Sequence, residues 1–388
     1  MKLVLGSESL RPPLTGIGNY TFHLLAALLR KPQLERIDCF SDAGWASAAQ
    51  ALAACERMSA APAAGQGWLA GLKAGLRSLP FAYPLRAKVR ELQYARRSGA
   101  LADWVYHEPN FILKPHPGPS VVTVHDLSFV HYPAFHPPER VRWLNRELPG
   151  TLARACHVLT VSELVRQELI EQFAVPASKV SATHLGVSAH FRPCIQTDKT
   201  LQAYGLEHGR YLAFVGTLEP RKGLDVLLDA YLQLPAALRR AYPLAIAGAS
   251  GWQNSALLGR MERLRRTGEI RLLSYLPLAD LPAFYSGAAV FVYPSVYEGF
   301  GLPVLEAMAC GAPVVIAAGT AMQEFCGVAG TTFPAGQGEA LAQVLGGLLE
   351  DPVRRQAAGR AGPRIAARHS WDRCAELTIH AYEHAAKA

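Results

Sequence analysis

Glu298 and Glu306 are the residues of this sequence whose types and spacing most plainly suggest chemistry. The first lies on a glycine-containing loop and the second in the first turns of a predicted helix, which Pro303 opens and Gly311 closes. Residues 299–302 leave backbone N–H groups free at the start of this helix, where the helix dipole favours an anion such as a phosphate. A ligand with phosphates and hydroxyl groups fits this pattern. A surface turn with a well-placed acidic residue explains the pattern alone equally well.

Arg221 and Lys222 are a second candidate pair. They follow a predicted strand, the glycine Gly216 and a turn that begins at Pro220. A departing pyrophosphate gathers negative charge as its bond breaks, and two adjacent cations at the end of a strand can stabilise that charge without a metal ion. The alternative is a solvated pair of charges on an ordinary loop.

Two further features follow strands in the first half of the chain. Gly16 and Gly18 precede a helical stretch and would let the backbone approach a ligand, although a simple tight turn explains them as well. His125 ends an apolar strand. Its imidazole could bind a sugar hydroxyl or a phosphate or move a proton, and the alternative is a purely structural hydrogen bond.

Short β-branched runs alternate with longer helical patterns, which predicts α/β units with parallel sheets. The expected strands are residues 2–6, 104–107, 121–125, 157–161, 211–216, 244–248, 270–274, 290–293 and 313–317, and the expected helices include residues 17–29, 139–155, 163–173 and 224–234. In doubly wound sheets ligands bind beyond the carboxyl ends of the strands, which is where the candidate residues fall.

A length of 388 residues predicts two domains. Residues 191–200 resemble a linker, so we expect an N-terminal domain over residues 1–194 and a second domain from residue 195. No apolar run is long enough to span a bilayer. The apolar run at the N-terminus is too short for the core of a signal peptide and is typical of a first strand. We therefore expect a cytoplasmic protein.

Charge and composition narrow the possible partners. The net charge of +8 favours an anionic partner, but there is no nucleic-acid-binding signature. The seven cysteines are scattered without a CxxC pair, so we expect reduced thiols, and no spacing of cysteines or histidines suggests a metal site.

Residues 67–77 combine an apolar stripe with basic residues, and more arginines follow up to Arg97. This pattern is typical of a basic amphipathic helix that rests on an anionic membrane surface. A domain helix with its apolar stripe against the core is the alternative.

Five segments together resemble one family. They are residues 15–20, 124–129, 161–163, 214–223 and 298–307, and they extend over most of the chain. The chain resembles a retaining GT-B glycosyltransferase of the large family with a Glu-x7-Glu motif, family four in the usual classification. The residues of these motifs are most similar to those of bacterial mannosyltransferases of lipopolysaccharide and polysaccharide assembly.

The resemblance implies two Rossmann-like domains with parallel sheets that face a central cleft. The domain of residues 195–370 would hold the nucleotide sugar and the first domain the acceptor, while a last helix within residues 371–388 would pack back on the first domain. The implied donor contacts are Glu306 on the ribose hydroxyls, Glu298 on the sugar hydroxyls, the amides of Phe300, Gly301 and Leu302 on the sugar and diphosphate, Arg221 and Lys222 on the diphosphate, Gly216 beside them, Gly16 or Gly18 approaching from the other domain, and His125 beside the transferred sugar.

One residue departs from the family pattern. Thr217 stands where many members have an arginine, and Arg221 directly adjoins Lys222, so the two cations are differently arranged. The sequence has no Asp-x-Asp, so we expect no metal requirement and no other cofactor. Transfer with retention by same-face attack is the expected mechanism, because no residue stands out as a covalent nucleophile.

The expected substrates follow from the subfamily resemblance. GDP-mannose is the expected donor and a glycan or lipid-linked saccharide the expected acceptor, with peripheral contact at the cytoplasmic face of the inner membrane. UDP-glucose or UDP-GlcNAc are alternative donors. A sugar phosphorylase, an epimerase or a non-catalytic protein that binds nucleotide sugars are alternatives on the same fold. A dehydrogenase is disfavoured, because no G-x-G-x-x-G follows a strand with an acidic residue about twenty residues on.

Overall fold

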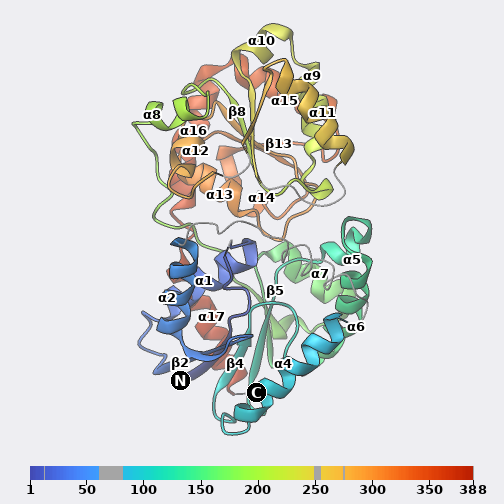
Figure 1. Cartoon of the computed structure of the whole chain (residues 1–388), viewed down its shortest axis with the longest axis vertical. Helices are drawn as coiled ribbons and strands as arrows, with labels where there is room; N and C mark the ends of the chain where they lie inside the picture. Colours follow the sequence, from blue (N-terminus) through green and yellow to red (C-terminus); the bar gives the residue numbers. More distant parts are fainter. Residues whose placement is uncertain (13, 61–81, 249–254, 274–275, 388) are drawn as a thin grey trace, which may run out of the picture. The chain divides into compact units, whose positions relative to one another are not determined.

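The computed structural model describes residues 1–387 except 13, 61–81, 249–254 and 274–275. The chain divides into two compact units. The N-terminal unit comprises Met1–Gly186 and Trp371–Ala388, and the C-terminal unit comprises Val187–Ser370. Each unit has its own sheet flanked by helices, which confirms the predicted α/β class (Figure 1). No described helix has the length and apolar character needed to cross a membrane.

The N-terminal unit contains a seven-stranded sheet in the order β3-β2-β1-β4-β5-β6-β7. All neighbouring strands in it are parallel except β2 and β3. Its strands are β1 (Lys2–Gly6), β2 (Arg36–Ser41), β3 (Gly44–Ser47), β4 (Val105–Glu108), β5 (Ser120–Val124), β6 (His157–Thr160) and β7 (Val180–Ala182). Its helices are α1 (Gly16–Leu28), α2 (Ala48–Ala60), α4 (Ala82–Ser98), α5 (Ser128–His131), α6 (Pro138–Arg154), α7 (Glu163–Phe173) and α17 (Trp371–Ala385).

The C-terminal unit contains a six-stranded parallel sheet in the order β10-β9-β8-β11-β12-β13. Its strands are β8 (Leu212–Val215), β9 (Leu244–Ala247), β10 (Ile270–Leu273), β11 (Val290–Tyr293), β12 (Val314–Ala317) and β13 (Gly330–Phe333). Its helices are α8 (Asp198–Ala203), α9 (Leu224–Gln233), α10 (Ala236–Ala241), α11 (Ser255–Arg266), α12 (Leu281–Ser286), α13 (Leu302–Ala309), α14 (Gln323–Cys326), α15 (Gly338–Glu350) and α16 (Pro352–Ala366).

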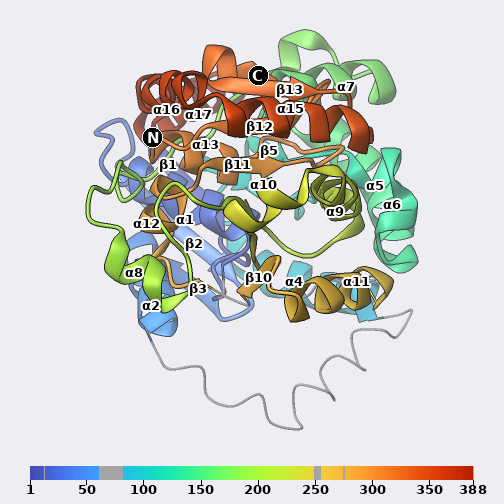
Figure 2. The same ribbon diagram turned by 90° about the horizontal axis from the view of Figure 1, so that it is seen from above.

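Helices cover the second sheet on both faces. Helices α9 and α15 pack against each other, while α13 packs against α12 and α16 (Figures 1 and 2). The central strand β11 is buried along its whole length, as is usual for a parallel sheet covered on both sides. Its carboxyl end, next to that of β8, carries the loops with the candidate residues.

The division between the units falls before the expected linker. The segment after Gly186 belongs to the C-terminal unit, where the Val187 amide donates to the His369 carbonyl at 3.0 Å and the Cys194 amide to the Ser286 hydroxyl at 2.9 Å. The end of the expected linker is already helical, because α8 begins at Asp198.

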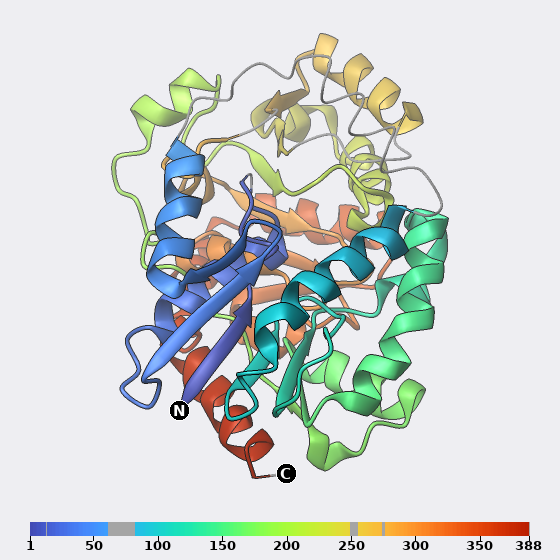
Figure 3. The ribbon, with the colours of Figure 1, turned by 60° about the horizontal axis from the view of Figure 1, so that its bottom comes forward.

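The last helix, α17, packs against α1 within the N-terminal unit, and Figures 1 and 3 show it in red alongside the blue first elements of that unit. A buried hydrogen-bond chain also fixes it to the sheet. The Tyr382 hydroxyl lies 2.7 Å from Nδ1 of His107, and Nε2 of His107 lies 2.8 Å from the Thr123 hydroxyl. The helix therefore belongs structurally to a unit whose other residues lie far away in the sequence.

Candidate active site

Two loops meet at the carboxyl ends of the neighbouring strands β8 and β11. The first loop contains the short 3-10 helix Pro220–Lys222, and the second leads from Tyr293 into α13. The Val296 amide donates to the Arg221 carbonyl at 3.1 Å, which ties the loops together. Gly223 permits this approach, because its φ is +68° and a Cβ there would overlap the Pro294 carbonyl oxygen. Parallel pairing thus joins residues that are remote in sequence.

The Glu298 carboxylate binds both candidate cations. Oε1 lies 2.6 Å from Nζ of Lys222, and Oε2 lies 3.1 Å from Nη1 of Arg221. The side chains of all three are largely buried. Burial opposes ionisation of Glu298, but the charges of Arg221 and Lys222 outweigh it and lower its pKa to about 2. The structure therefore brings these three predicted residues together as one charged cluster.

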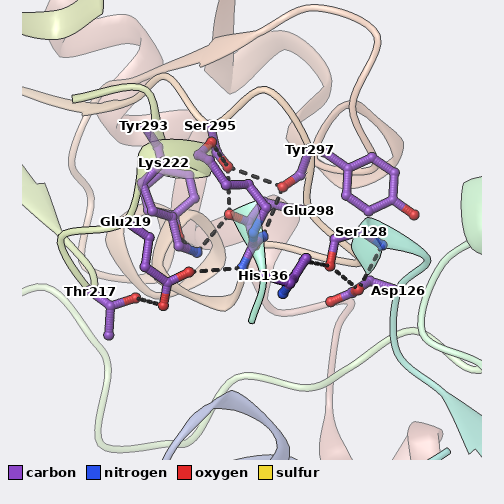
Figure 4. A network of polar contacts seen from close by, with 11 residues as sticks. Asp126, Ser128, His136, Thr217, Glu219, Lys222, Tyr293, Ser295, Tyr297 and Glu298 are labelled. Carbon is purple, nitrogen blue, oxygen red and sulfur yellow. Dashed lines mark hydrogen bonds and ion pairs between the residues drawn. The ribbon is translucent and has the colours of Figure 1, made fainter. Parts of the chain in front are cut away.

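Neutral groups hold this cluster in place. The Lys222 ammonium donates to the Tyr293 hydroxyl at 2.7 Å, and the Ser295 hydroxyl donates to Oε1 of Glu298 at 2.6 Å (Figure 4). Arg221 also donates to the Tyr297 carbonyl at 2.9 Å. Sequence reasoning did not single out Tyr293, and the only available signal was its place at the end of an apolar strand.

A third carboxylate lies on the other side of Arg221. Oε2 of Glu219 is 3.7 Å from Nη2 of Arg221, and its Oε1 accepts from the Thr217 hydroxyl at 2.8 Å. Thr217, the residue that departs from the pattern expected in the sequence analysis, thus orients a carboxylate next to the cations. Gly216, just before it, is half-buried, and a Cβ there would lie 3.3 Å from the ring of Phe214.

The start of α13 has the geometry expected of an anion site. Gly301 caps the helix with φ +102°, and a Cβ there would collide with the side chain of Met322. The helix begins at Leu302, one residue before Pro303. The first amides of a helix have no partner inside it. Phe300 packs on Phe325 with ring centroids 4.8 Å apart, which fixes the loop just before these amides.

Glu306 lies further along α13, in a different environment from Glu298. Burial raises the pKa of Glu306 to about 7, and a hydrogen bond from the Tyr285 hydroxyl at 3.0 Å partly offsets this rise. The phenol of Tyr293 lies close enough to both carboxylates for each to raise its pKa, after burial, well above the ordinary value. Both glutamates therefore interact electrostatically with Tyr293.

In the N-terminal unit, His125 follows β5 and is buried. Its Nε2 donates to the Pro109 carbonyl at 2.7 Å, and its ring packs edge-on against Tyr20 with centroids 4.8 Å apart. Burial lowers the pKa of His125, and the Pro109 contact and Asp126 oppose this only in part. A neutral imidazole with Nε2 committed to a carbonyl keeps Nδ1 as a hydrogen-bond acceptor.

The two glycines of the first loop differ in their surroundings. Gly18 is buried, and a Cβ on it would lie 2.8 Å from the Ser9 carbonyl oxygen, so local packing requires a glycine there. Gly16 is exposed at the first position of α1 with no atom within 4 Å of a built Cβ. Of the two, Gly16 is the one with open space for a ligand.

The described part of the chain contains no group of three or more histidine, cysteine, aspartate or glutamate side chains that could hold a metal ion. All seven cysteines are free thiols. The expected amphipathic stretch at residues 67–77 lies outside the described residues.

Comparison with known proteins identifies the family. Residues 14–191 match the model of Glycosyltransferase Family 4, and residues 197–364 match that of Glycosyl transferases group 1. O-antigen chain mannosyltransferase B of Escherichia coli is 37% identical over 99% of this chain and 100% of its own length.

Solved structures show the same fold at low sequence identity. Sucrose-phosphate synthase from Thermosynechococcus elongatus superposes with a TM-score of 0.72 at 20% identity, over 99% of this chain and 98% of that one. WaaG, a glycosyltransferase involved in lipopolysaccharide biosynthesis, gives 0.70 at 16% identity, over 97% and 98%. This chain therefore belongs to the glycosyltransferases of group 1 and family 4, and it has their two-domain GT-B fold.

Proposed function

We propose that this glycosyltransferase moves mannose from GDP-mannose, with retention, onto a glycan or lipid-linked acceptor during assembly of a cell-surface polysaccharide. The choice of mannose rests on the full-length similarity to O-antigen chain mannosyltransferase B. The chemistry rests on one structural observation. Two largely buried cations and a helix N-terminus lie together at the carboxyl ends of β8 and β11, next to a carboxylate that can accept hydrogen bonds from hydroxyl groups.

The cations serve the leaving group. As the sugar–phosphate bond breaks, negative charge grows on the diphosphate, and fixed positive charges in a site shielded from water stabilise that charge most strongly. Lys222 and Arg221 supply two charges, and the amides at the start of α13 supply partial ones. This set of groups replaces a metal clamp, so we propose that transfer needs no metal ion.

The state of the carboxylates supports same-face attack, rather than a covalent intermediate, as the route to the proposed retention. Glu298 is held by two cations and a hydroxyl, and its lowered pKa makes it a weak nucleophile. We infer that the acceptor hydroxyl attacks from the face that the diphosphate leaves, and that a phosphate oxygen takes the hydroxyl proton. Glu306 would accept hydrogen bonds from the ribose, and Nδ1 of His125 one from the transferred sugar.

The acceptor side of the proposal concerns α4. This helix exposes Val89 at 46% and Leu92 at 59% of their surface, with the exposed Lys88 directly before Val89 and the exposed Arg96 four residues after Leu92. Apolar side chains flanked by cations are typical of a surface that rests on anionic lipid. We infer peripheral contact at the cytoplasmic face of the inner membrane, where a lipid-linked acceptor would be presented.

The test is a transfer assay that compares GDP-mannose with UDP-glucose and UDP-GlcNAc, with and without a lipid-linked saccharide acceptor and with EDTA. We expect GDP release only with GDP-mannose and acceptor, unchanged by EDTA. Lys222→Ala should lose most turnover, whereas Lys199→Ala, which removes an exposed lysine of the same unit, should not. Turnover with UDP-sugars alone would refute mannose. Loss on EDTA that manganese restores would refute metal independence.

A further inference from the structure

The two cations proposed for the diphosphate are already occupied by a carboxylate. Glu298 contacts Lys222 at 2.6 Å and Arg221 at 3.1 Å through different oxygens. A phosphate oxygen that accepts hydrogen bonds from the same two groups must lie about 3 Å from each of them. It would then lie next to the Glu298 carboxylate, and two negative charges at that separation repel each other strongly in a buried site.

The carboxylate cannot easily leave this position. The Ser295 hydroxyl donates to Oε1 at 2.6 Å, and Ser295 itself is fully buried. The Tyr293 hydroxyl holds Lys222 at 2.7 Å, so the ammonium also has a fixed place. Glu298 remains ionised at neutral pH because its pKa is about 2, burial being outweighed by the two cations. A bound diphosphate therefore always faces a fixed negative charge.

Two nucleotides experience this charge differently. The hexose of a nucleotide sugar carries hydroxyl groups that can donate hydrogen bonds to Glu298 and so compensate the repulsion. The free nucleoside diphosphate left after transfer has no such donors, and its outer phosphate carries more negative charge. We propose that Glu298 is a specificity-determining residue that makes the site favour the sugar-bearing donor over its own nucleoside diphosphate product. This inference rests on the proposed function.

The proposal explains why a site for a diphosphate contains an anion. A cationic pocket without Glu298 would bind the product most tightly at the moment when it must leave. With Glu298 in place, loss of the sugar removes the groups that compensated the carboxylate, so transfer itself weakens binding of the remaining nucleotide. Product release limits turnover in many enzymes.

The test compares binding of GDP and GDP-mannose by isothermal titration calorimetry at about pH 8. Glu298→Gln removes the charge but keeps an oxygen for Lys222 and Ser295. We expect it to tighten GDP binding by about tenfold, the scale of one partly screened charge contact, and to weaken or leave unchanged the binding of GDP-mannose. Turnover is not the readout, so loss of catalysis does not obscure the result.

Glu219→Gln is the matched control. It removes one negative charge from the same arginine, 3.7 Å away, and so measures the general effect of charge on the more anionic GDP. The ratio of GDP to GDP-mannose affinity should change several-fold more in Glu298→Gln than in Glu219→Gln. Equal changes in the two variants would overturn the proposal.

A second measurement needs no variant. In the wild-type protein, saturating free mannose should tighten GDP binding, because its hydroxyls satisfy Glu298, and GDP should tighten mannose binding by the same factor. Absence of this coupling would count against the role of Glu298.

A wrong choice of donor would give a different result. If the wild-type protein binds UDP and UDP-glucose instead, GDP-mannose is refuted as the donor, and the ratio of nucleoside diphosphate to nucleotide sugar affinity is then measured with UDP and UDP-glucose. If it binds neither pair, the proposed function and this inference both fall.

Discussion

Two glutamates of one site have opposite electrostatic environments. Glu298 is neutralised by two cations, which outweigh its burial and lower its pKa to about 2, whereas Glu306 has no cation within bonding distance in the described residues and burial raises its pKa to about 7. At neutral pH the first is a permanent charge and the second is close to half-ionised. Of these two glutamates, Glu306 is therefore the one whose change of charge near neutral pH can make donor binding depend on pH.

We predict that GDP-mannose binding weakens as the pH falls from about 8 to about 6. Only the ionised Glu306 can accept hydrogen bonds from two ribose hydroxyls, and its ionised fraction falls from about nine-tenths to about one-tenth over this range. Kd should therefore rise by up to about tenfold, as measured by calorimetry. The diphosphate diester of a nucleotide sugar, unlike a terminal phosphate, does not titrate near pH 6.

Two variants separate this effect from other titrations. Glu306→Gln should make the affinity independent of pH across the same range. Tyr285→Phe removes the hydrogen bond that lowers the Glu306 pKa and should move the midpoint to higher pH. A wild-type affinity that stays constant between pH 8 and 6 would contradict the assignment of Glu306 to the ribose.

At the scale of elements, the start of α13 depends on a backbone conformation that only glycine adopts cheaply. Gly301→Ala should cost about 1–2 kcal/mol in the free energy of unfolding for the left-handed φ, and it should also weaken GDP-mannose binding, because the new methyl group displaces Met322 or the loop amides. Urea unfolding and calorimetry measure the two effects.

Gly311 at the other end of α13 provides the control. Its φ is +81°, but a Cβ there has its nearest neighbour at 3.6 Å, so Gly311→Ala has a similar backbone cost without the collision. It should lower stability alone. Equal loss of donor affinity in both variants would show that general destabilisation, rather than the loop amides, is responsible.

Local patterns predicted most of these elements. Residues 290–293 and 163–173 form the strand and helix that were expected, because an apolar run between turn residues and a Ser162 N-cap are signals contained in a few neighbouring residues. The strands β2, β3, β7 and β13 escaped prediction. The last three lie at sheet edges, where partial exposure allows a mixed composition and weakens the apolar pattern. Strand β2 is interior, but Asp38, which pairs with Arg36 and Arg97, interrupts its apolar run.

Contacts between remote residues explain what the sequence could not predict at the site. Arg221, Lys222 and Glu298 were each expected near the donor, but their direct ion pairs follow from the pairing of β8 with β11. Tyr285 reaches Glu306 only because α12 packs on α13, and neither its type nor its spacing signals this contact. Residue types thus indicated the chemistry, and sheet order determined the partners.

At the scale of the whole molecule, the two units differ in their buried titratable groups. The five histidines whose pKa values are lowered, first of all by burial, lie in the N-terminal unit: His23, His107, His116, His125 and His157. For His107, between α17 and β5, burial and then His125 lower the pKa to about 3. One buried glutamate in each unit acts in the opposite direction, because burial raises the pKa of Glu108 in the N-terminal unit and that of Glu306 in the C-terminal unit.

The two units should therefore respond differently to acid. Below about pH 6.5 His107 is protonated in the unfolded chain but stays neutral in the folded protein, so this residue alone lowers the stability by about 1.4 kcal/mol per pH unit. Glu306 has the opposite effect, because its raised pKa favours folding as the pH falls from about 7 toward the ordinary pKa of a glutamate.

Tryptophan fluorescence reports mainly the N-terminal unit, since only Trp252 lies outside it. Urea midpoints by fluorescence should fall between pH 7.5 and 5.5, and Tyr382→Phe should lower them further because it leaves the buried Nδ1 of His107 without its hydrogen-bond partner. The same midpoint at both pH values would contradict this account, as would a Tyr231→Phe control in the C-terminal unit that lowered the fluorescence midpoint equally.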